Sequence, residues 1–289
     1  MKKLSVILSC ILIASVFFAL PVSSAGNEPK NDYDVSKTFG EKYDLIKINV
    51  ACSHLTVKIS PDNTTRISYK NNNPDRVEFK TEIKDNTLIV EEKIKKNTNN
   101  RNLKISEINV EIPKAVYKKI NLDTISGTVI ADVPETENLY VNTISGIITL
   151  NYKGNNNPDY LKNTTVSGNV TVNNFSPKKF DISLTSGILN VNGLSGSGSL
   201  KVVSGTANLD YKKWDSALSV KVVSGNANIK VPAGSGADLT LSRISGSVQY
   251  DMNGVSGKLS KSGSVVIKGT NMQTVKANIT NGNISIKTK

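Results

Sequence analysis

The sequence predicts an all-β protein, a single-stranded β-helix or β-solenoid of about 20-residue Ser-Gly coils with a less regular β N-terminal cap. Three observations predict it. A Ser-Gly dipeptide returns at spacings of 19, 22, 19, 18, 20 and 21 residues. Apolar residues stand two and four positions after each of these glycines, with mostly polar residues between them, which is the alternation of a half-buried strand. No long amphipathic helix pattern occurs in the chain.

The dipeptides define seven candidate turn sites, which we predict to be structural. They are Ser126, Gly127, Ser145, Gly146, Ser167, Gly168, Ser186, Gly187, Ser204, Gly205, Ser224, Gly225, Ser245 and Gly246. Ser262-Gly263 and Asn281-Gly282 extend the series, so the sequence predicts nine successive coils over residues 116–289. Glycine suits such a bend because it adopts positive φ at no steric cost, and because stacked backbones leave no room for a Cβ.

Stacking is expected because a single coil cannot bury its own apolar face, whereas neighbouring coils bury a continuous core. Asn190, Asn208 and Asn228 share one column, so their amides are expected to form a ladder. A meander of β-hairpins closed by Ser-Gly loops is the alternative architecture. It would give antiparallel sheets and would not need a steady period, so the regular spacing favours the solenoid.

The front of the chain is less regular. Residues 26–38 are polar and predict a flexible lead, and residues 39–115 predict an N-terminal β cap of degenerate coils or a small subdomain. Cys52-Ser53 stands where a Ser-Gly would be expected, with apolar residues at the two usual offsets. Residues 93–103, with the sequence KIKKNTNNRNL, predict a charged polar loop.

Residues 1–25 predict a signal peptide cleaved after Ala25, because two lysines precede an apolar stretch at 4–20 and small residues precede the cleavage position. We therefore expect a secreted or cell-surface, envelope-associated protein. Lipidation at Cys10 and retention of the stretch as an uncleaved membrane anchor are the alternatives. The mature chain contains no other apolar segment long enough to span a membrane.

The charge of the chain indicates its partners. Removal of two lysines with the signal lowers the formal net charge from +12 to +10. A cationic exported protein is attracted to anionic surfaces and polymers. Lysines at outward strand positions also keep a repeat protein soluble and protect its edges, and this explanation is favoured. Nucleic acid is a poor candidate, because aromatic residues make up only 6% of an exported chain.

The sequence offers little catalytic chemistry. His54 is the one histidine, and Cys52 is the one cysteine after cleavage, so no internal disulfide forms. The two could make a weak metal pair, but a turn that lacks its glycine explains them better. The column four residues before the glycines holds a single carboxylate, Asp123, where hydrolases and lyases need a converging set. We predict no enzyme, no cofactor and no metal site.

One aromatic pair allows two interpretations. Trp214 and Tyr211 form either an exposed carbohydrate platform or a flap that covers the core, and the flap is favoured.

The runs EIPK at 111–114 and YKKINLDTISG at 117–127 resemble the start of the repeats in the bacterial "putative adhesin" domain family, long catalogued as a domain of unknown function. Residues 46–59 and 86–90 are similar to the front part of that family. The resemblance covers about residues 40–289. It implies a β-helix-like solenoid, export and a surface or adhesive role, and it carries over no functional residues. Cys52-Ser53-His54 departs from the Ser-Gly expected there.

Our leading hypothesis is an exported, non-enzymatic, adhesin-like binding scaffold at the surface or in the medium. Its partners would be an anionic envelope polymer, a glycan or a surface protein, bound through outer faces rich in Thr, Asn, Ser and Lys. An envelope-associated structural or regulatory module that partners a membrane protein is the first alternative. A carbohydrate-active β-helix enzyme is the second.

Overall fold

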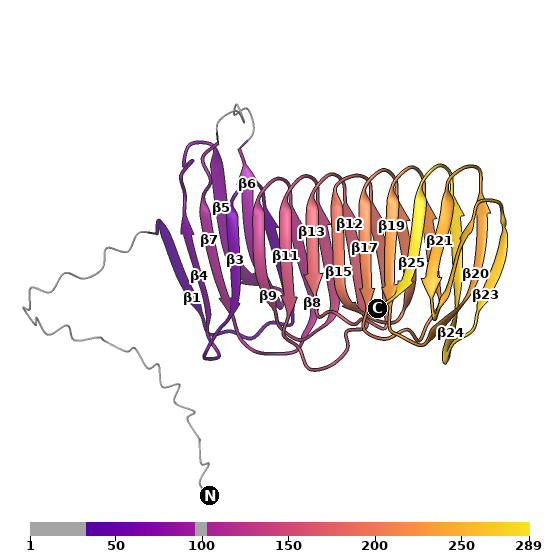
Figure 1. Ribbon diagram of the computed structural model, residues 1–289. Coiled ribbons are helices and arrows are strands. Elements are labelled where there is room, and N and C mark those ends of the chain that lie inside the picture. Colours follow the sequence, from indigo (N-terminus) through magenta and orange to yellow (C-terminus); the bar gives the residue numbers. More distant parts are fainter. Residues whose placement is uncertain (1–32, 96–102) are drawn as a thin grey trace, which may run out of the picture. The chain divides into compact units, whose positions relative to one another are not determined.

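The computed structural model describes residues 33–95 and 103–289, which form one unit from Tyr33 to Lys289. The regular elements in these ranges are strands (Figure 1). No helix in them is long and apolar enough to cross a membrane. The predicted signal peptide at 1–25, most of the predicted lead at 26–38 and most of the predicted loop at 93–103 lie outside the described residues.

The strands form two long sheets. In sheet A, 13 strands lie in the order β1 (Val35–Phe39), β4 (Thr65–Lys70), β7 (Glu107–Ile112), β3 (His54–Ile59), β9 (Thr128–Val133), β11 (Ile147–Tyr152), β13 (Asn169–Asn173), β15 (Ile188–Leu194), β17 (Thr206–Tyr211), β19 (Asn226–Val231), β25 (Asn283–Thr288), β21 (Ser247–Met252) and β22 (Val255–Leu259). In sheet B, 12 strands lie in the order β23 (Gly263–Ile267), β20 (Ser235–Arg243), β24 (Asn271–Ile279), β18 (Leu218–Val222), β16 (Ser197–Val202), β14 (Lys179–Leu184), β12 (Tyr160–Thr165), β10 (Thr136–Thr143), β8 (Tyr117–Thr124), β2 (Leu45–Val50), β6 (Thr87–Ile94) and β5 (Val77–Lys84).

Each regular coil consists of one strand of sheet B, a corner that holds the Ser-Gly, and one strand of sheet A (Figure 1). Equivalent strands of adjacent coils pair in parallel and in register, so that Ile148 lies beside Val129 on one side and Val170 on the other. The parallel pairing confirms the predicted β-solenoid and rules out the hairpin meander. Among the described strands, antiparallel pairing occurs only near the two ends, in the pairs β1–β4, β4–β7, β5–β6, β20–β23 and β21–β22.

The core fills the space between the sheets. The two apolar offsets after each corner point inward, and Ile148, Leu150, Val170 and Val172 are at most 1% exposed. Burying one such side chain contributes roughly 1.5–3 kcal/mol, and the stack repeats this in every coil. Trp214 is also buried, and its indole N–H donates to the carbonyl oxygen of Gly236 at 2.9 Å. The flap interpretation of Trp214 is therefore correct and the exposed platform is not.

The order of coils in space differs from their order in the chain. The final coil, β24–β25, lies between β18–β19 and β20–β21 in both sheets. The prediction of nine successive coils is wrong at this end. Ser262-Gly263 is not a corner, because β23 runs antiparallel to β20 at the edge of sheet B. The corner at Asn281-Gly282 instead stacks directly on Ser224-Gly225.

A short crossover makes this insertion possible. Residues 268–270 lead from β23, on the outer side of β20, to β24 on its inner side. The amide of Thr270 donates to the carbonyl oxygen of Gly234 at 2.8 Å. The side-chain amide of Asn253 donates to the carbonyl oxygens of Ser235 at 2.8 Å and Lys268 at 3.0 Å. The crossover is thus bonded to the start of the strand that it passes.

The front of the chain shows the same exchange. The first coil, β2–β3, stacks directly on β8–β9, and the second coil, β6–β7, lies outside it. The region at 39–115, which we expected to be degenerate coils or a small subdomain that caps the front, thus adds two coils to the same two sheets, and the antiparallel strands β1, β4 and β5 lie outside them. Within the expected flexible lead, residues from Val35 onward form strand β1, which pairs with β4.

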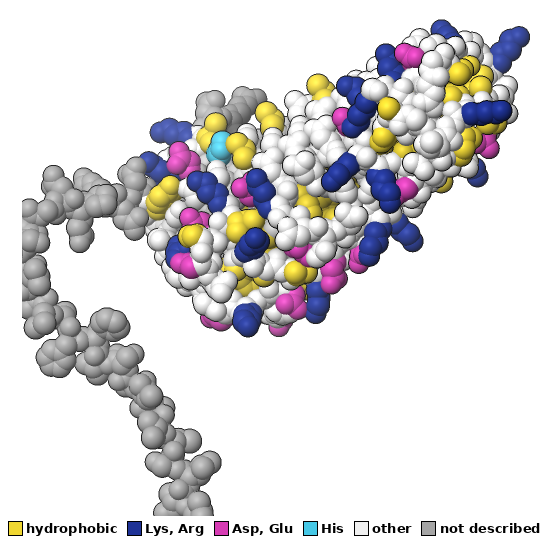
Figure 2. All heavy atoms as spheres, turned by 60° about the horizontal axis from the view of Figure 1, so that its bottom comes forward, with side chains coloured by type: hydrophobic (Ala, Val, Ile, Leu, Met, Phe, Trp, Pro, Cys, Tyr) yellow, Lys and Arg dark blue, Asp and Glu magenta, His cyan; other side chains and the backbone are white. Residues whose placement is uncertain are grey.

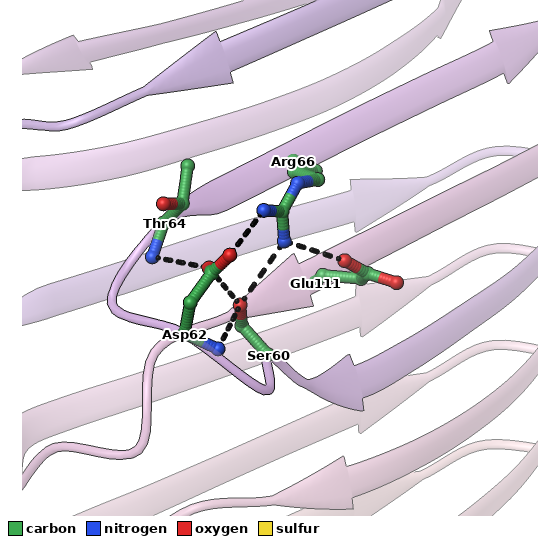
Figure 3. A network of polar contacts seen from close by, with 5 residues as sticks. All are labelled: Ser60, Asp62, Thr64, Arg66 and Glu111. Carbon is green, nitrogen blue, oxygen red and sulfur yellow. Dashed lines mark hydrogen bonds and ion pairs between the residues drawn. The ribbon is translucent and has the colours of Figure 1, made fainter.

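A surface network ties β4 to β7 (Figure 3). The Arg66 guanidinium pairs with the carboxylates of Asp62 and, at 3.1 Å, Glu111. The amide of Thr64 and the hydroxyl of Ser60 donate to Asp62 at 3.0 and 2.9 Å. The hydrogen bond from Arg66 lowers the pKa of the Asp62 carboxyl. Because the charged side chains are partly exposed to solvent, the network orients the loop between β3 and β4 more than it stabilises the fold.

Candidate binding surface

The predicted turn residues lie in one file along an edge of the stack. Six of the serines use both their amide N–H and their hydroxyl to donate to one carbonyl oxygen of the preceding corner. Ser145, for example, donates to Ile125 from its amide at 2.8 Å and from its hydroxyl at 3.0 Å. The amide of Ile147 then donates to the carbonyl oxygen of Gly127 at 3.0 Å. Serine at the corner therefore adds a side-chain bond to the backbone ladder.

Close approach explains the glycines better than backbone conformation does. A Cβ on Gly146 would lie 2.6 Å from the carbonyl oxygen of Gly127, which is too close for any real Cβ. A Cβ on Gly205 would lie 2.7 Å from the carbonyl oxygen of Gly187. Among the seven predicted turn glycines, only Gly187 and Gly246 have a positive φ. Steric exclusion by the preceding corner is thus the common requirement along the file.

A buried carboxylate completes the file at the front. Ser53 takes the place of glycine, and the Glu92 carboxylate accepts the amide N–H groups of Ala51, Cys52 and Ser53 at 2.9, 3.0 and 3.2 Å, together with the Ser53 hydroxyl. Glu92 is only 3% exposed. In the inner coils of the stack, carbonyl oxygens of the adjacent corner accept the corresponding amide N–H groups. No regular corner precedes Ser53, so the Glu92 carboxylate supplies the acceptors there instead.

Among the described residues, Cys52 and His54, which we weighed as a weak metal pair, do not lie in a group of metal ligands. Burial, and secondarily the charge of Glu92, raises the pKa of the Cys52 thiol to about 11, so the thiol stays protonated at neutral pH. His54 opens β3 and shares its register with Glu107 and Thr128 on the neighbouring strands. Within residues 33–95 and 103–289, no group of three or more His, Cys, Asp or Glu side chains is placed to hold a metal ion.

The outer face of sheet A is neutral and bonded within itself. The Asn208 amide donates to the side-chain oxygen of Asn190 at 2.8 Å, and the Asn228 amide donates to Asn208 at 2.8 Å, which confirms the predicted ladder. A second ladder runs beside it, in which Asn192 donates to Asn173 at 2.8 Å and Asn173 donates to Asn151 at 3.0 Å. These amides are already engaged along the stack.

The outer face of sheet B is basic. We define the sheet-B face as the outward columns through Lys119, Asn121 and Asp123, from β2 across to β24. It carries seven lysines and two carboxylates, a net of 7 − 2 = +5: Lys47, Lys119, Lys162, Lys179, Lys201, Lys221 and Lys276, with Asp123 and Asp181. Among the described residues, none of these seven lysines is in an ion pair.

Basic side chains are not restricted to this one face. Figure 2 shows lysine and arginine side chains along the length of the stack, with acidic side chains between them. On the sheet-A face, Lys58, Lys230 and Lys287 point outward, as do Asp132, Asp210 and Asp251, so the charges of its central columns cancel. The two broad faces therefore differ in net charge although they share one repeat.

Two tyrosines form a cluster on the sheet-B face. Tyr140 and Tyr160 lie on adjacent strands with ring centroids 5.9 Å apart and an interplanar angle of 69°. The Lys119 ammonium group lies 4.2 Å from the centroid of the Tyr140 ring. Burial, followed by the charge of the nearby Asp181 carboxylate, raises the pKa of Tyr160. Both rings are half-buried, so part of each apolar surface faces the solvent.

A groove of about 470 Å³ lies where the sheet-B face meets the corner file. Ile125, Ile144 and Val166, the residues that precede the corner serines, line it and are 49%, 51% and 43% exposed. Its polar lining includes Asp123 and Asn142, which are joined by a hydrogen bond of 2.6 Å. The groove thus combines an aliphatic row with a polar row.

Comparison with known proteins identifies the family. The family model described as Toastrack DUF4097 matches residues 43–287. The chain belongs to the toastrack DUF4097 family. The match begins ahead of the first regular Ser-Gly corner, so the front coils are part of the toastrack domain. The predicted resemblance to the "putative adhesin" domain family is confirmed by this match and by the solved structures described next.

Two solved structures share the toastrack fold of this chain. A "putative adhesin" from Parabacteroides distasonis ATCC 8503 is 14% identical, with a TM-score of 0.53, and the alignment covers 88% of this chain and 96% of that chain. A "putative adhesin" from Bacteroides fragilis NCTC 9343 is 15% identical, with a TM-score of 0.51 and the same coverage of 88% and 96%. No curated protein matches the chain.

Sequence reasoning missed two features of this toastrack domain. The first is Glu92, which occupies an inward position of β6, two residues after the buried Val90. A carboxylate at a position where the alternation predicts an apolar residue could have revealed it. Tyr140 and Tyr160 lie in neighbouring outward columns of adjacent coils, but they become neighbours only once the register is known.

We predict that Gly146→Ala destabilises the domain by about 1–3 kcal/mol, because the added methyl group collides with the carbonyl oxygen of Gly127. Urea unfolding followed by circular dichroism measures this. Gly263→Ala is the matched control, since its Cβ would meet no atom within 4 Å. That variant should be neutral or slightly more stable. Equal losses in the two variants would contradict the steric account of the corners.

We also predict that Cys52 reacts slowly with iodoacetamide. In the folded Cys10→Ser chain at pH 8, alkylation should be roughly 100-fold slower than in urea, because a thiol with a pKa of about 11 is almost wholly protonated there. The rate should rise as the pH approaches 11. Glu92→Gln removes a charge that raises this pKa, so the folded variant should react faster. A folded chain that reacts as fast as the unfolded one would show that the thiol is not desolvated.

Proposed function

We propose that this toastrack chain is a non-enzymatic, adhesin-like scaffold at the bacterial surface that binds an anionic polymer through the sheet-B face. The observation that supports this proposal most is that the sheet-B face carries seven lysines and only two carboxylates. Because none of these ammonium groups forms an ion pair within residues 33–95 and 103–289, they remain available to a polyanion. A field of one sign over a broad surface also attracts such a ligand from a distance.

The repeat favours a polymeric ligand over a small one. Successive coils place outward side chains about 4.8 Å apart along the stack, so a chain of repeating anionic units meets cationic positions on several coils. Many weak contacts on one ligand raise the overall affinity well above that of a single contact. The two solved relatives are described as "putative adhesins", which accords with a surface-binding role for this chain.

The placement of the carboxylates supports a scaffold rather than a glycosidase on this face. Asp123 lies on β8 and Asp181 on β14, three strand steps apart in sheet B. That separation is roughly 14 Å, whereas paired catalytic carboxyl groups lie about 5–9.5 Å apart. Each is also engaged by a neighbour, since Asn142 donates to Asp123 at 2.6 Å and Ser199 donates to Asp181 at 2.7 Å.

We predict that the triple variant Lys162→Gln, Lys201→Gln and Lys221→Gln weakens binding of polygalacturonate by tenfold or more, because it removes three of the seven cations. Isothermal titration calorimetry at several NaCl concentrations measures the affinity and its salt dependence, which should become shallower in the variant.

The matched control replaces Lys58, Lys230 and Lys287 on the sheet-A face by glutamine, which removes the same charge from the other face. It should lower the affinity no more than twofold. The proposal fails if the unmodified protein shows no saturable binding of either polygalacturonate or poly-L-glutamate, or if the two triple variants lose affinity equally.

A further inference from the structure

The tyrosine pair distinguishes one part of the sheet-B face from the rest. The outward columns of the strands from β14 to β24 hold serine, lysine, threonine, asparagine and one aspartate, whereas β10 and β12 each place one aromatic ring there. Aromatic side chains bury a large apolar area when they are covered. Tyr140 and Tyr160 are only half-buried, so they leave an apolar area uncovered in the middle of a cationic surface.

Cations flank the two rings on both sides. On the β8 side, the Lys119 ammonium group lies 4.2 Å from the Tyr140 ring centroid, which is a cation–π distance. On the β14 side, Lys179 stands in register with Tyr160. Between them, Lys162 stands in register with Tyr140. Three lysines therefore lie on or beside the strand positions of one aromatic pair.

One acceptor lies at the rim of this cluster. Asp181 stands in register with Lys162, and the Ser199 hydroxyl donates to its carboxylate at 2.7 Å. A carboxylate has capacity for several hydrogen-bond donors, so Asp181 can still accept from a ligand hydroxyl.

This combination fits a sugar better than other anions. A pyranose ring has a C–H face that packs on an aromatic ring and hydroxyl groups at its edge that reach nearby acceptors and donors. A carboxylate on the same ring pairs with lysine. A polyanion without sugar rings, such as polyglutamate or polyphosphate, is attracted by the lysines alone and gains no packing contact with the tyrosine rings.

We propose that Tyr140 and Tyr160, with Lys119, Lys162 and Lys179, form a subsite for an acidic sugar residue of a polysaccharide. The rings would pack against the C–H face of the sugar, the lysines would pair with its carboxylate, and Asp181 would accept one of its hydroxyl groups. This subsite rests on the proposed function, because it makes one class of anionic polymer, the acidic glycan, the preferred ligand of the sheet-B face.

The test compares two carboxylate polymers on the full chain. Polygalacturonate carries its carboxylates on pyranose rings, and poly-L-glutamate carries them on a peptide. Tyr140→Ala with Tyr160→Ala should weaken polygalacturonate binding about tenfold and leave poly-L-glutamate binding within twofold. Tyr140→Phe with Tyr160→Phe keeps the rings and should bind polygalacturonate nearly as well as the unmodified protein. Calorimetry measures the affinities, and thermal unfolding checks that each variant is folded.

A second measurement needs no substitution. In the unmodified protein with isotope-labelled tyrosine, the ring resonances of Tyr140 and Tyr160 should shift on addition of oligogalacturonate and stay in place on addition of oligoglutamate. This measurement tests the proposed sugar subsite even if the double alanine variant does not fold.

The outcomes separate the two proposals. If the unmodified protein binds neither polymer, the proposed function fails and the subsite fails with it. If both polymers bind and the alanine variant loses affinity for both equally, or for neither, the subsite alone is overturned and the electrostatic scaffold stands. Loss confined to polygalacturonate, with ring shifts confined to the sugar oligomer, supports the subsite.

Discussion

The structure depends on how closely successive corners approach one another. Each regular corner donates three backbone amides and, in most coils, a serine hydroxyl to carbonyl oxygens of the adjacent corner. At that separation the preceding carbonyl oxygen leaves no room for a Cβ on the glycine. A slip by one residue would place a side chain where none fits, so the corner file fixes the register of both sheets. At the front end, the Glu92 carboxylate accepts the amides of the first corner in place of a preceding corner's carbonyl oxygens.

Fixed register determines what each face presents. Because side chains alternate along a strand, the columns that fill the core and the columns that face solvent are set by one alignment. On sheet A the outward columns become amide ladders that satisfy one another. On sheet B the outward columns form the lysine-rich sheet-B face, in which Tyr140 and Tyr160 lie side by side. The surface chemistry that we propose to be functional is thus a consequence of the same stacking that holds the fold together.

Much of this architecture could be predicted from the sequence because the repeat is local. The Ser-Gly spacing and the offsets at, for example, Val170 and Val172 identify strands, their inward faces and their parallel stacking. The order of the coils could not be predicted, since Val248 of β21 and Ile284 of β25 suit the same buried column and nothing in the pattern says which coil stacks on β19. The contact between Tyr140 and Tyr160 was not evident for a different reason, because the two rings lie in different columns and become neighbours only once the strand register is known.

Disulfide trapping on the sheet-A face tests the stacking most directly. With Cys10 and Cys52 replaced by serine, the pair Lys230→Cys and Lys287→Cys should oxidise readily to a disulfide, because β19 and β25 are neighbours whose Cα atoms lie within bridging distance. The pair Lys230→Cys and Asp251→Cys should stay reduced, because β25 separates β19 from β21 by two strand spacings, roughly 9.6 Å. Bridging of residues 230 and 251 without bridging of 230 and 287 would contradict the inserted final coil and the corner order on which both faces depend.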